Sequence, residues 1–269
     1  MIEKKILVKN IEVNYKVFGE GKSMLILHGW RSSSDRWQKA AELLAEKGVK
    51  VIVPDLPGFG LTPEPKMSWN LDNYVEWVRE LSEKIPELNK SFYLLGHSFG
   101  GAVSVKFAIK YNQKVEKLFL VAAACIRKKT FLKKVLYGFS KFIKIFSFLP
   151  YYQLARKAFY KFIIKKSDYI HFSGIMQEIY LRIISEDLSQ RLSFVKIPTI
   201  IIWGDADEST PIEQAHFINK KIEKSKLIII PKENHALQIK VPELLTEKIL
   251  DNLPSILLNG EILSLKNII

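Results

Sequence analysis

The fold is decided by residues 91–102, which read Ser91-Phe92-Tyr93-Leu94-Leu95-Gly96-His97-Ser98-Phe99-Gly100-Gly101-Ala102. A largely apolar run, residues 91–95, comes directly before a serine that has a glycine two positions away on each side, and a helix-like segment follows. This G-x-S-x-G pattern predicts a sharp strand-turn-helix with the hydroxyl at the tip of a strained turn. Gly96 and Gly100 are expected where a Cβ would collide with the adjacent strand and helix. The stretch therefore predicts Ser98 as a nucleophile.

Length and composition fit one globular α/β domain that carries an insertion. The chain has 269 residues, and 48% of them are hydrophobic. Its single cysteine, Cys125, excludes an intramolecular disulfide and favours a reducing compartment. The N-terminus enters strand-like sequence without a secretory signal pattern, and no apolar run approaches the roughly 20 residues that span a bilayer. We therefore expect a cytoplasmic protein.

Short apolar runs alternate with helix-like stretches along most of the chain. The expected strands are residues 5–9, 11–18, 24–28, 49–54, 91–95, 117–122, 199–203 and 226–230. The expected helices are residues 37–47, 71–84, 101–111, 211–220 and 242–252. This alternation predicts the α/β class, with a mostly parallel eight-stranded sheet flanked by helices. The first two strands lack a helix between them and are expected to form an antiparallel hairpin at the edge.

The alternation stops once, where about 70 residues look helical and no strand is evident. We divide the chain into a core, residues 1–125 and 195–269, and a helical cap or lid, residues 126–194. The net charge of +13 is concentrated in this cap, because residues 126–167 hold twelve Lys or Arg and no Asp or Glu. The rest of the chain is nearly neutral, with 29 basic and 28 acidic residues.

Three further motifs accompany the serine pentapeptide. They are Leu27-His28-Gly29-Trp30 with Trp37 downstream, Pro54-Asp55-Leu56-Pro57-Gly58-Phe59-Gly60, and Trp203-Gly204-Asp205-Ala206-Asp207 followed later by Asn234-His235. With these motifs the chain resembles the α/β-hydrolase superfamily over nearly its whole length, and more narrowly its capped carboxylesterase-like members. It is also similar to pimeloyl-acyl-carrier-protein methyl ester esterases. The resemblance implies an oxyanion loop, a nucleophilic serine, an acid and a histidine, in that chain order.

The resemblance also implies which residues act with Ser98. The family places its base in the loop after the last core strand, and His235 is the histidine that lies there. The acid is expected after the preceding strand, where Asp205, Asp207 and Glu208 lie. The family's W-G-x-x-D pattern favours Asp207, with Asp205 as the main competitor. A Ser98, Asp207 and His235 triad is therefore expected.

Binding roles follow from the same resemblance. An oxyanion hole needs two backbone N–H groups, which the family pattern assigns to Phe99 and Trp30. We expect His28 and Gly29, in the Trp30 loop, to contribute to the substrate site. The cap is rich in aromatic residues, and an apolar acyl pocket is expected there. The cap residues expected to bind substrate are Tyr137 and Phe139.

We expect a serine esterase that cleaves carboxylic esters of short to medium acyl chains, or lactones, through an acyl-enzyme on Ser98. Three alternatives stay open: a carrier-protein methyl ester esterase that uses the basic cap, a carbon–carbon bond hydrolase, and a ligand receptor on a hydrolase fold. Expected partners are a small-molecule ester and, for the basic cap, an acidic carrier protein or an anionic surface. Lysines that only cover a solvent face explain the cap equally well. No nucleic acid, metal or other cofactor is expected.

Overall fold

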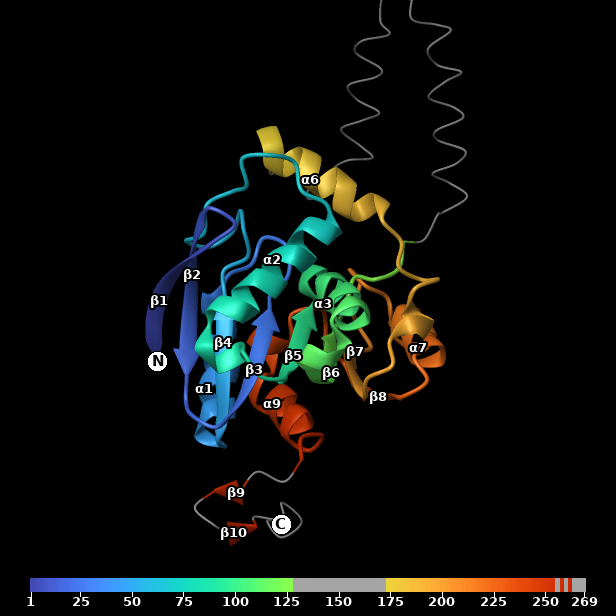
Figure 1. Ribbon diagram of the computed structural model, residues 1–269. Coiled ribbons are helices and arrows are strands. Elements are labelled where there is room, and N and C mark those ends of the chain that lie inside the picture. Colours follow the sequence, from blue (N-terminus) through green and yellow to red (C-terminus); the bar gives the residue numbers. More distant parts are fainter. Residues whose placement is uncertain (128–172, 255–256, 259–260, 263–269) are drawn as a thin grey trace, which may run out of the picture.

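The computed structural model describes residues 1–127, 173–254, 257–258 and 261–262. Its centre is an eight-stranded sheet in the order β1-β2-β4-β3-β5-β6-β7-β8 (Figure 1). Neighbouring strands are parallel from β4 to β8, whereas β1 with β2, and β2 with β4, are antiparallel. The strands are β1 (Ile2–Val8), β2 (Ile11–Phe18), β3 (Lys22–Leu27), β4 (Val49–Pro54), β5 (Phe92–His97), β6 (Val115–Val121), β7 (Thr199–Gly204) and β8 (Ser225–Ile230). The predicted mostly parallel eight-stranded sheet and its edge hairpin are confirmed.

The parallel register brings the carboxyl ends of several strands to one edge of the sheet. Leu27 at the end of β3 pairs with Gly96 in β5, and Gly204 at the end of β7 pairs with Ile230 at the end of β8. In open parallel sheets the loops that leave this edge carry the ligand site. Side chains from the loops after β3, β5, β7 and β8 therefore meet in one region.

Helices cover both faces of the sheet. They are α1 (Gln38–Glu46), α2 (Leu71–Lys84), α3 (Phe99–Lys110), α6 (Gly174–Ser185), α7 (Ile212–Lys221), α8 (Leu237–Lys240) and α9 (Pro242–Leu250). Because strand side chains alternate between faces, Leu25 and Leu27 of β3 join a core cluster with α2, α3 and α7. Met24 and Ile26 join a second cluster with α1 and α9. The core thus consists of two apolar layers, one on each side of the sheet.

Some helix boundaries agree with the prediction and others differ from it. Helix α2 has its predicted bounds, and a reciprocal capping box between Asn70 and Asn73 fixes its start. Helix α3 begins at Phe99 rather than at residue 101, because the chain turns from β5 into the helix at Ser98 without a loop. Neither α8 nor the short pair β9 (Leu257–Leu258) and β10 (Glu261–Ile262) was predicted.

The excursion between β6 and β7 is described in part. Helix α6 crosses over the carboxyl edge of the sheet (Figure 1), and its residues Met176, Ile179 and Ile183 join the first core cluster. Residues 128–172 lie outside the described residues, and with them most of the predicted cap, residues 126–194. Tyr137, Phe139 and eleven of the twelve basic residues of the segment 126–167 also fall there. Among the described residues, no helix combines the length and the apolar character needed to cross a membrane.

Candidate active site

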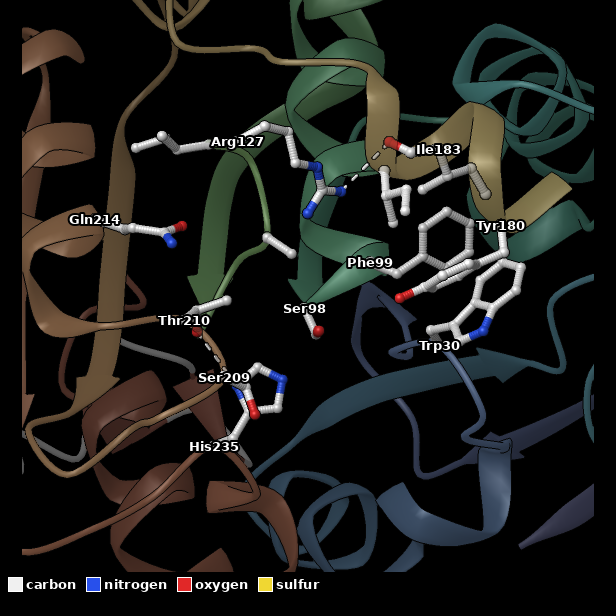
Figure 2. Close-up of a pocket in the computed structure, with 13 residues that line it drawn as sticks. Trp30, Ser98, Phe99, Arg127, Tyr180, Ile183, Ser209, Thr210, Gln214 and His235 are labelled. Carbon is white, nitrogen blue, oxygen red and sulfur yellow. Dashed lines mark hydrogen bonds between the residues drawn. The ribbon is translucent and has the colours of Figure 1, made fainter. Parts of the chain in front are cut away.

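Ser98 occupies a strained turn between β5 and α3. Its φ and ψ are 52° and −115°, a conformation that is rare for residues other than glycine. Backbone hydrogen bonds hold this conformation: Ser98 N donates to Val121 O (3.1 Å), and Ser98 O accepts from Gly101 N (3.0 Å) and Ala124 N (2.9 Å). The fold therefore presents the Ser98 hydroxyl at a fixed point of the carboxyl edge, where it lines a pocket (Figure 2).

The two glycines of the pentapeptide are required by close backbone packing. A Cβ on Gly100 would lie 2.5 Å from the carbonyl carbon of Leu27, and a Cβ on Gly96 would lie 2.5 Å from the oxygen of Gly100. Neither neighbour is a flexible side chain that could move aside. The packing agrees with the role that the sequence predicted for both glycines.

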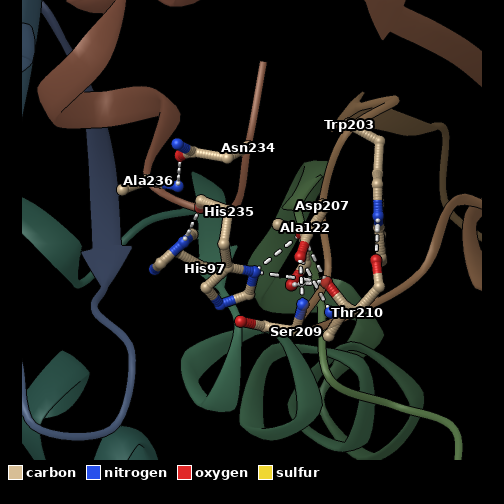
Figure 3. Close-up of polar contacts among 9 residues, drawn as sticks. All are labelled: His97, Ala122, Trp203, Asp207, Ser209, Thr210, Asn234, His235 and Ala236. Atoms are coloured by element: carbon tan, nitrogen blue, oxygen red, sulfur yellow. Dashed lines mark hydrogen bonds and ion pairs between the residues drawn. The ribbon is translucent and has the colours of Figure 1, made fainter. Parts of the chain in front are cut away.

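His235 and Asp207 come together from the loops after β8 and β7. The Nδ1 atom of His235 lies 2.7 Å from Oδ2 of Asp207, whose side chain is fully buried (Figure 3). The other carboxylate oxygen, Oδ1, accepts the N–H groups of Ser209 and Thr210, each at 2.8 Å. Burial alone would raise the pKa of Asp207, but the hydrogen bonds and charge of His235, together with the Thr210 hydrogen bonds, hold it below its usual value. The lowered pKa indicates that Asp207 is ionised where it contacts His235.

The structure distinguishes Asp207 from its competitor. Asp205 is exposed, and its Oδ1 accepts the N–H of Lys232 at 2.6 Å. That contact ties the β7 and β8 loops together but leaves Asp205 away from the histidine. The W-G-x-x-D spacing, rather than mere nearness to the end of β7, identifies the carboxylate that contacts His235.

Two further histidines are buried beside the site. His97 Nε2 lies 2.9 Å from the backbone oxygen of His235, and burial, with a smaller effect of His235, lowers the pKa of His97 to about 3. His28 Nδ1 lies 2.8 Å from Gly29 O, while its Nε2 accepts from Leu56 N at 2.9 Å. Burial lowers the pKa of His28 to about 4. Both rings are therefore neutral near pH 7 and contact backbone groups around the site.

The expectation that His28 contributes to substrate binding is wrong for its side chain. The ring is fully buried, does not line the pocket, and has both nitrogens engaged by backbone groups. Gly29 is closer to the reacting group, because a Cβ on Gly29 would lie 3.2 Å from Cβ of Ser98. His28 thus shapes the loop that carries Gly29 and Trp30.

Phe99 and Trp30, expected to supply the oxyanion N–H groups, both line the pocket next to Ser98 (Figure 2). Phe99 is the first residue of α3, so its N–H has no acceptor within the helix. The Trp30 ring packs against Phe99 and Phe59, with centroid separations of 5.4 and 4.8 Å. Aromatic packing therefore fixes the Trp30 loop against the nucleophile turn.

The pocket above Ser98 has a volume of about 400 Å³. Its apolar wall includes Ile126, after β6, and Ile183, in α6. Polar groups come from Arg127, Tyr180 and Gln214. Arg127 is the only permanently charged side chain among the described residues that line it.

Several residues of the site were not singled out from the sequence. Thr210 donates its hydroxyl to Asp207 Oδ2 at 2.7 Å and lies 3.2 Å from His235 Nδ1. The spacing Asp207-x-x-Thr210 was the available signal, because an Asp often accepts hydrogen bonds from residues two and three positions on. Arg127 was counted only as part of the basic cap, and no local pattern pointed to Tyr180 or Gln214.

Known proteins share this architecture. The family model described as serine aminopeptidase, S33, matches residues 21–239. Lipase 3 of Moraxella sp. (strain TA144) is 26% identical over 235 residues, covering 80% of this chain and 72% of the lipase. Proline iminopeptidase of Saccharolobus solfataricus is 26% identical over 253 residues, covering 82% and 81%. A thermophilic esterase from Thermogutta terrifontis has a similar fold, with a TM-score of 0.70, 22% identity and coverage of 93% and 97%.

Proposed function

The chain belongs to the serine aminopeptidase, S33, family and is a hydrolase of the α/β-hydrolase fold, and from this premise we propose that it is a carboxylic ester hydrolase acting through an acyl-enzyme on Ser98. One observation carries the proposal. Ser98, at the tip of its strained turn, shares a pocket with His235, whose Nδ1 contacts the buried carboxylate of Asp207. Nucleophile, base and orienting acid are the three roles that acyl transfer requires.

The first half-reaction forms the acyl-enzyme. Ser98 Oγ attacks the ester carbonyl carbon while its proton passes to Nε2 of His235. Asp207 favours the tautomer with the proton on Nδ1, which leaves Nε2 able to accept, and its charge stabilises the imidazolium. The tetrahedral intermediate then expels the alkoxide, which takes the proton from His235 and leaves as an alcohol.

The second half-reaction regenerates the serine. Water gives a proton to His235 and attacks the acyl carbonyl, and Ser98 Oγ leaves with that proton while the carboxylic acid is released. The N–H groups of Phe99 and Trp30 are proposed to stabilise the oxyanion in both halves. In enzymes each such donor contributes about 2.7 to 4 kcal/mol to the transition state.

The charge of the pocket favours an ester over a peptide with a free amino terminus. An aminopeptidase has to bind a substrate ammonium, which needs a carboxylate or several oxygen acceptors when it is desolvated. No Asp or Glu is found among the described lining residues, and Arg127 would repel an ammonium group. Asp207 is buried and already bonded to His235 and Thr210. These contacts support ester hydrolysis.

The cavity supports acyl chains of short to medium length. Its volume of about 400 Å³ lies at the lower end of the 300–1,000 Å³ range typical of small-molecule sites. Ile126 and Ile183 provide apolar surface for a hydrocarbon chain. A lactone of similar size would meet the same walls, so ring esters belong in the same substrate panel.

The test is turnover of 4-nitrophenyl esters from C2 to C12, beside proline 4-nitroanilide as the peptidase probe. We expect ester turnover that Ser98→Ala and His235→Ala each reduce by at least about 10³-fold. Ser209→Ala serves as the matched control, because it removes another pocket hydroxyl while the Ser209 N–H bond to Asp207 stays. Anilide turnover without ester turnover would point to an aminopeptidase. A folded protein that binds esters but turns over neither probe would point to a receptor.

A further inference from the structure

We infer that Arg127 forms an anion subsite in the pocket, so that the substrate is an ester bearing a carboxylate. This inference rests on the proposed ester hydrolysis and names the substrate class that the pocket would select. Arg127 lies on the segment that leaves β6, and Figure 2 shows its guanidinium pointing into the pocket, with Ser98 between it and His235 in this view. A cation that lines the same pocket as Ser98 needs a physical reason.

The guanidinium is poorly satisfied by the protein itself. Within the part of the chain that the structure describes, its one hydrogen bond runs from Nη2 to Ile183 O at a long 3.4 Å, and its buried Nε has no partner. Burial lowers the pKa of Arg127 by more than the charges of nearby groups, among them Asp187 and Glu186, raise it, although arginine still keeps its charge at neutral pH. The guanidinium N–H groups that no described residue accepts are available to bind a ligand.

The nearby carboxylates are committed elsewhere. Asp187 accepts the backbone N–H of Arg127 and of Ser189 on Oδ1, and the Ser189 hydroxyl on Oδ2. Glu186 forms an ion pair with the buried Lys106 at 2.5 Å. Among the described residues, neither carboxylate forms an ion pair with the guanidinium. The positive charge of Arg127 is therefore available to the pocket.

Two neutral polar side chains lie in the same pocket. The Tyr180 ring packs against Trp30 at a centroid separation of 5.4 Å, and Figure 2 shows its hydroxyl pointing toward the space above Ser98. Gln214 is buried, and its Oε1 has no hydrogen-bond partner among the described residues. Since the oxygen and nitrogen of an amide are exchanged by rotation, Gln214 can turn its NH₂ group to an anion. A cation and two neutral donors thus share one cavity.

A carboxylate fits this donor set better than other anions. Guanidinium groups bind carboxylates through two parallel hydrogen bonds, and one arginine balances their single charge. A phosphate monoester carries between about 1.5 and 2 negative charges at pH 7 and would need a second cation. The carboxylate could belong to the acyl part or to the alcohol part of the ester, and the test separates the two.

The experiment compares esters that differ only by a charged terminus. The acyl-side pair is 4-nitrophenyl hydrogen adipate and its terminal amide. The alcohol-side pair is the hexanoate ester of glycolic acid and that of glycolamide, followed by titration of the released acid. We expect the native protein to prefer the carboxylate member of one pair by about 10- to 100-fold in kcat/KM, the range for a hydrogen bond to a charged group.

Variants assign the preference to Arg127. Arg127→Gln should bring the ratio of kcat/KM for the carboxylate member to kcat/KM for the amide member down to about one, and Arg127→Lys should keep part of the preference, because lysine retains the charge without the planar fork. Arg182→Gln is the matched control, since Arg182 is exposed on α6 and does not line the pocket. No preference in either pair, or an equal loss for both members in Arg127→Gln, would overturn the inference.

A binding assay keeps the inference testable if no ester is hydrolysed. Calorimetry on Ser98→Ala would compare monomethyl adipate with dimethyl adipate, with and without Arg127→Gln. Tighter binding of the monoanion that is lost in Arg127→Gln supports the subsite even when the proposed hydrolysis fails. Equal binding of both compounds rejects the subsite whether or not esters are hydrolysed.

Discussion

The Thr210 hydroxyl offers a sharp test of how Asp207 is held. It is buried and lies 2.7 Å from Asp207 Oδ2, 3.2 Å from His235 Nδ1 and 3.3 Å from Ala122 O. Thr210→Val replaces this hydroxyl with a methyl group of similar shape. The backbone should stay in place, because Thr210 N still donates to Asp207 Oδ1 and Thr210 O still accepts from Trp203 Nε1.

We expect Thr210→Val to lower the stability of the protein more than its activity. A hydrogen bond to a charged group contributes about 1.5 to 3 kcal/mol, and the complete burial of the Asp207 side chain favours the upper half of that range. We expect the free energy of unfolding to fall by about 2 to 3 kcal/mol at pH 7. Asp207 keeps its bonds from His235, Ser209 and the Thr210 N–H, so kcat/KM should fall by less than about tenfold.

The pH dependence follows from the lowered pKa of Asp207. A carboxylate whose folded pKa lies below its unfolded value, about 3.9, contributes stability that is fully present above that value. This contribution is lost as the pH falls through the folded pKa. The difference between Thr210→Val and the native protein should therefore be full at pH 7 and shrink below about pH 4.

The assay is urea unfolding followed by tryptophan fluorescence at pH 7, with kcat/KM measured in parallel. Thr210→Ser is the matched control, because it keeps the hydroxyl and loses only the methyl group. A native-like stability for Thr210→Val, or a serine variant no more stable than the valine variant, would refute the reasoning. A loss of kcat/KM near 10⁴-fold would show that the hydroxyl orients His235 directly.

Three further predictions concern the same region. Asp207→Asn should keep the fold but lower kcat/KM by about 10⁴-fold, because an amide favours the wrong tautomer of His235. Asp205→Asn should change kcat/KM by less than about threefold. Equal losses of kcat/KM in the two variants would contradict the assignment of Asp207. His28 and His97, with pKa values of about 4 and about 3, are neutral in the folded protein but bind protons in the unfolded chain below about pH 6.5. The free energy of unfolding measured in urea should therefore fall from about pH 6.5 toward pH 4. A flat profile would contradict their burial as neutral rings. Gly100→Ala should lower the melting temperature and abolish turnover, because its Cβ would meet the Leu27 backbone, and a native-like variant would contradict that packing.

Much of the core could be predicted because its signals are local. Parallel strands buried on both faces appear as short continuous apolar runs. Strand β5 leads into a serine with a glycine two positions away on each side, a pattern that few turns other than this strand-turn-helix require. Asp207 and His235 could be named because the resemblance to the α/β-hydrolase superfamily supplied the W-G-x-x-D pattern and the place of the histidine, and the structure has the two loops at the same edge of the sheet. The strands needed only local pattern, whereas the two site residues also needed the resemblance.

The remainder depended on contacts between distant segments. The placement of Arg127 in the pocket depends on how the chain leaves β6 relative to Tyr180 and Ile183 of α6, more than 50 residues later. The side chain of His28 was misplaced, because its ring is satisfied by the backbone of Leu56, from a different loop. No periodicity or spacing in the chain encodes either contact.

The two ends of the excursion between β6 and β7 are joined to each other. Leu188 N donates to Cys125 O at 2.9 Å, and Arg127 N donates to Asp187 Oδ1 at 3.2 Å. One residue before this junction, Ala124 N holds the oxygen of Ser98 at 2.9 Å. The two hydrogen bonds at this junction hold the ends of the excursion close together, and insertions between closely spaced ends are the kind that folds tolerate. A different segment grafted beyond these hydrogen bonds would change substrate choice while Ala124 N still holds the oxygen of Ser98. A graft that replaced the hydrogen-bonded residues would loosen both the junction and the turn at Ser98.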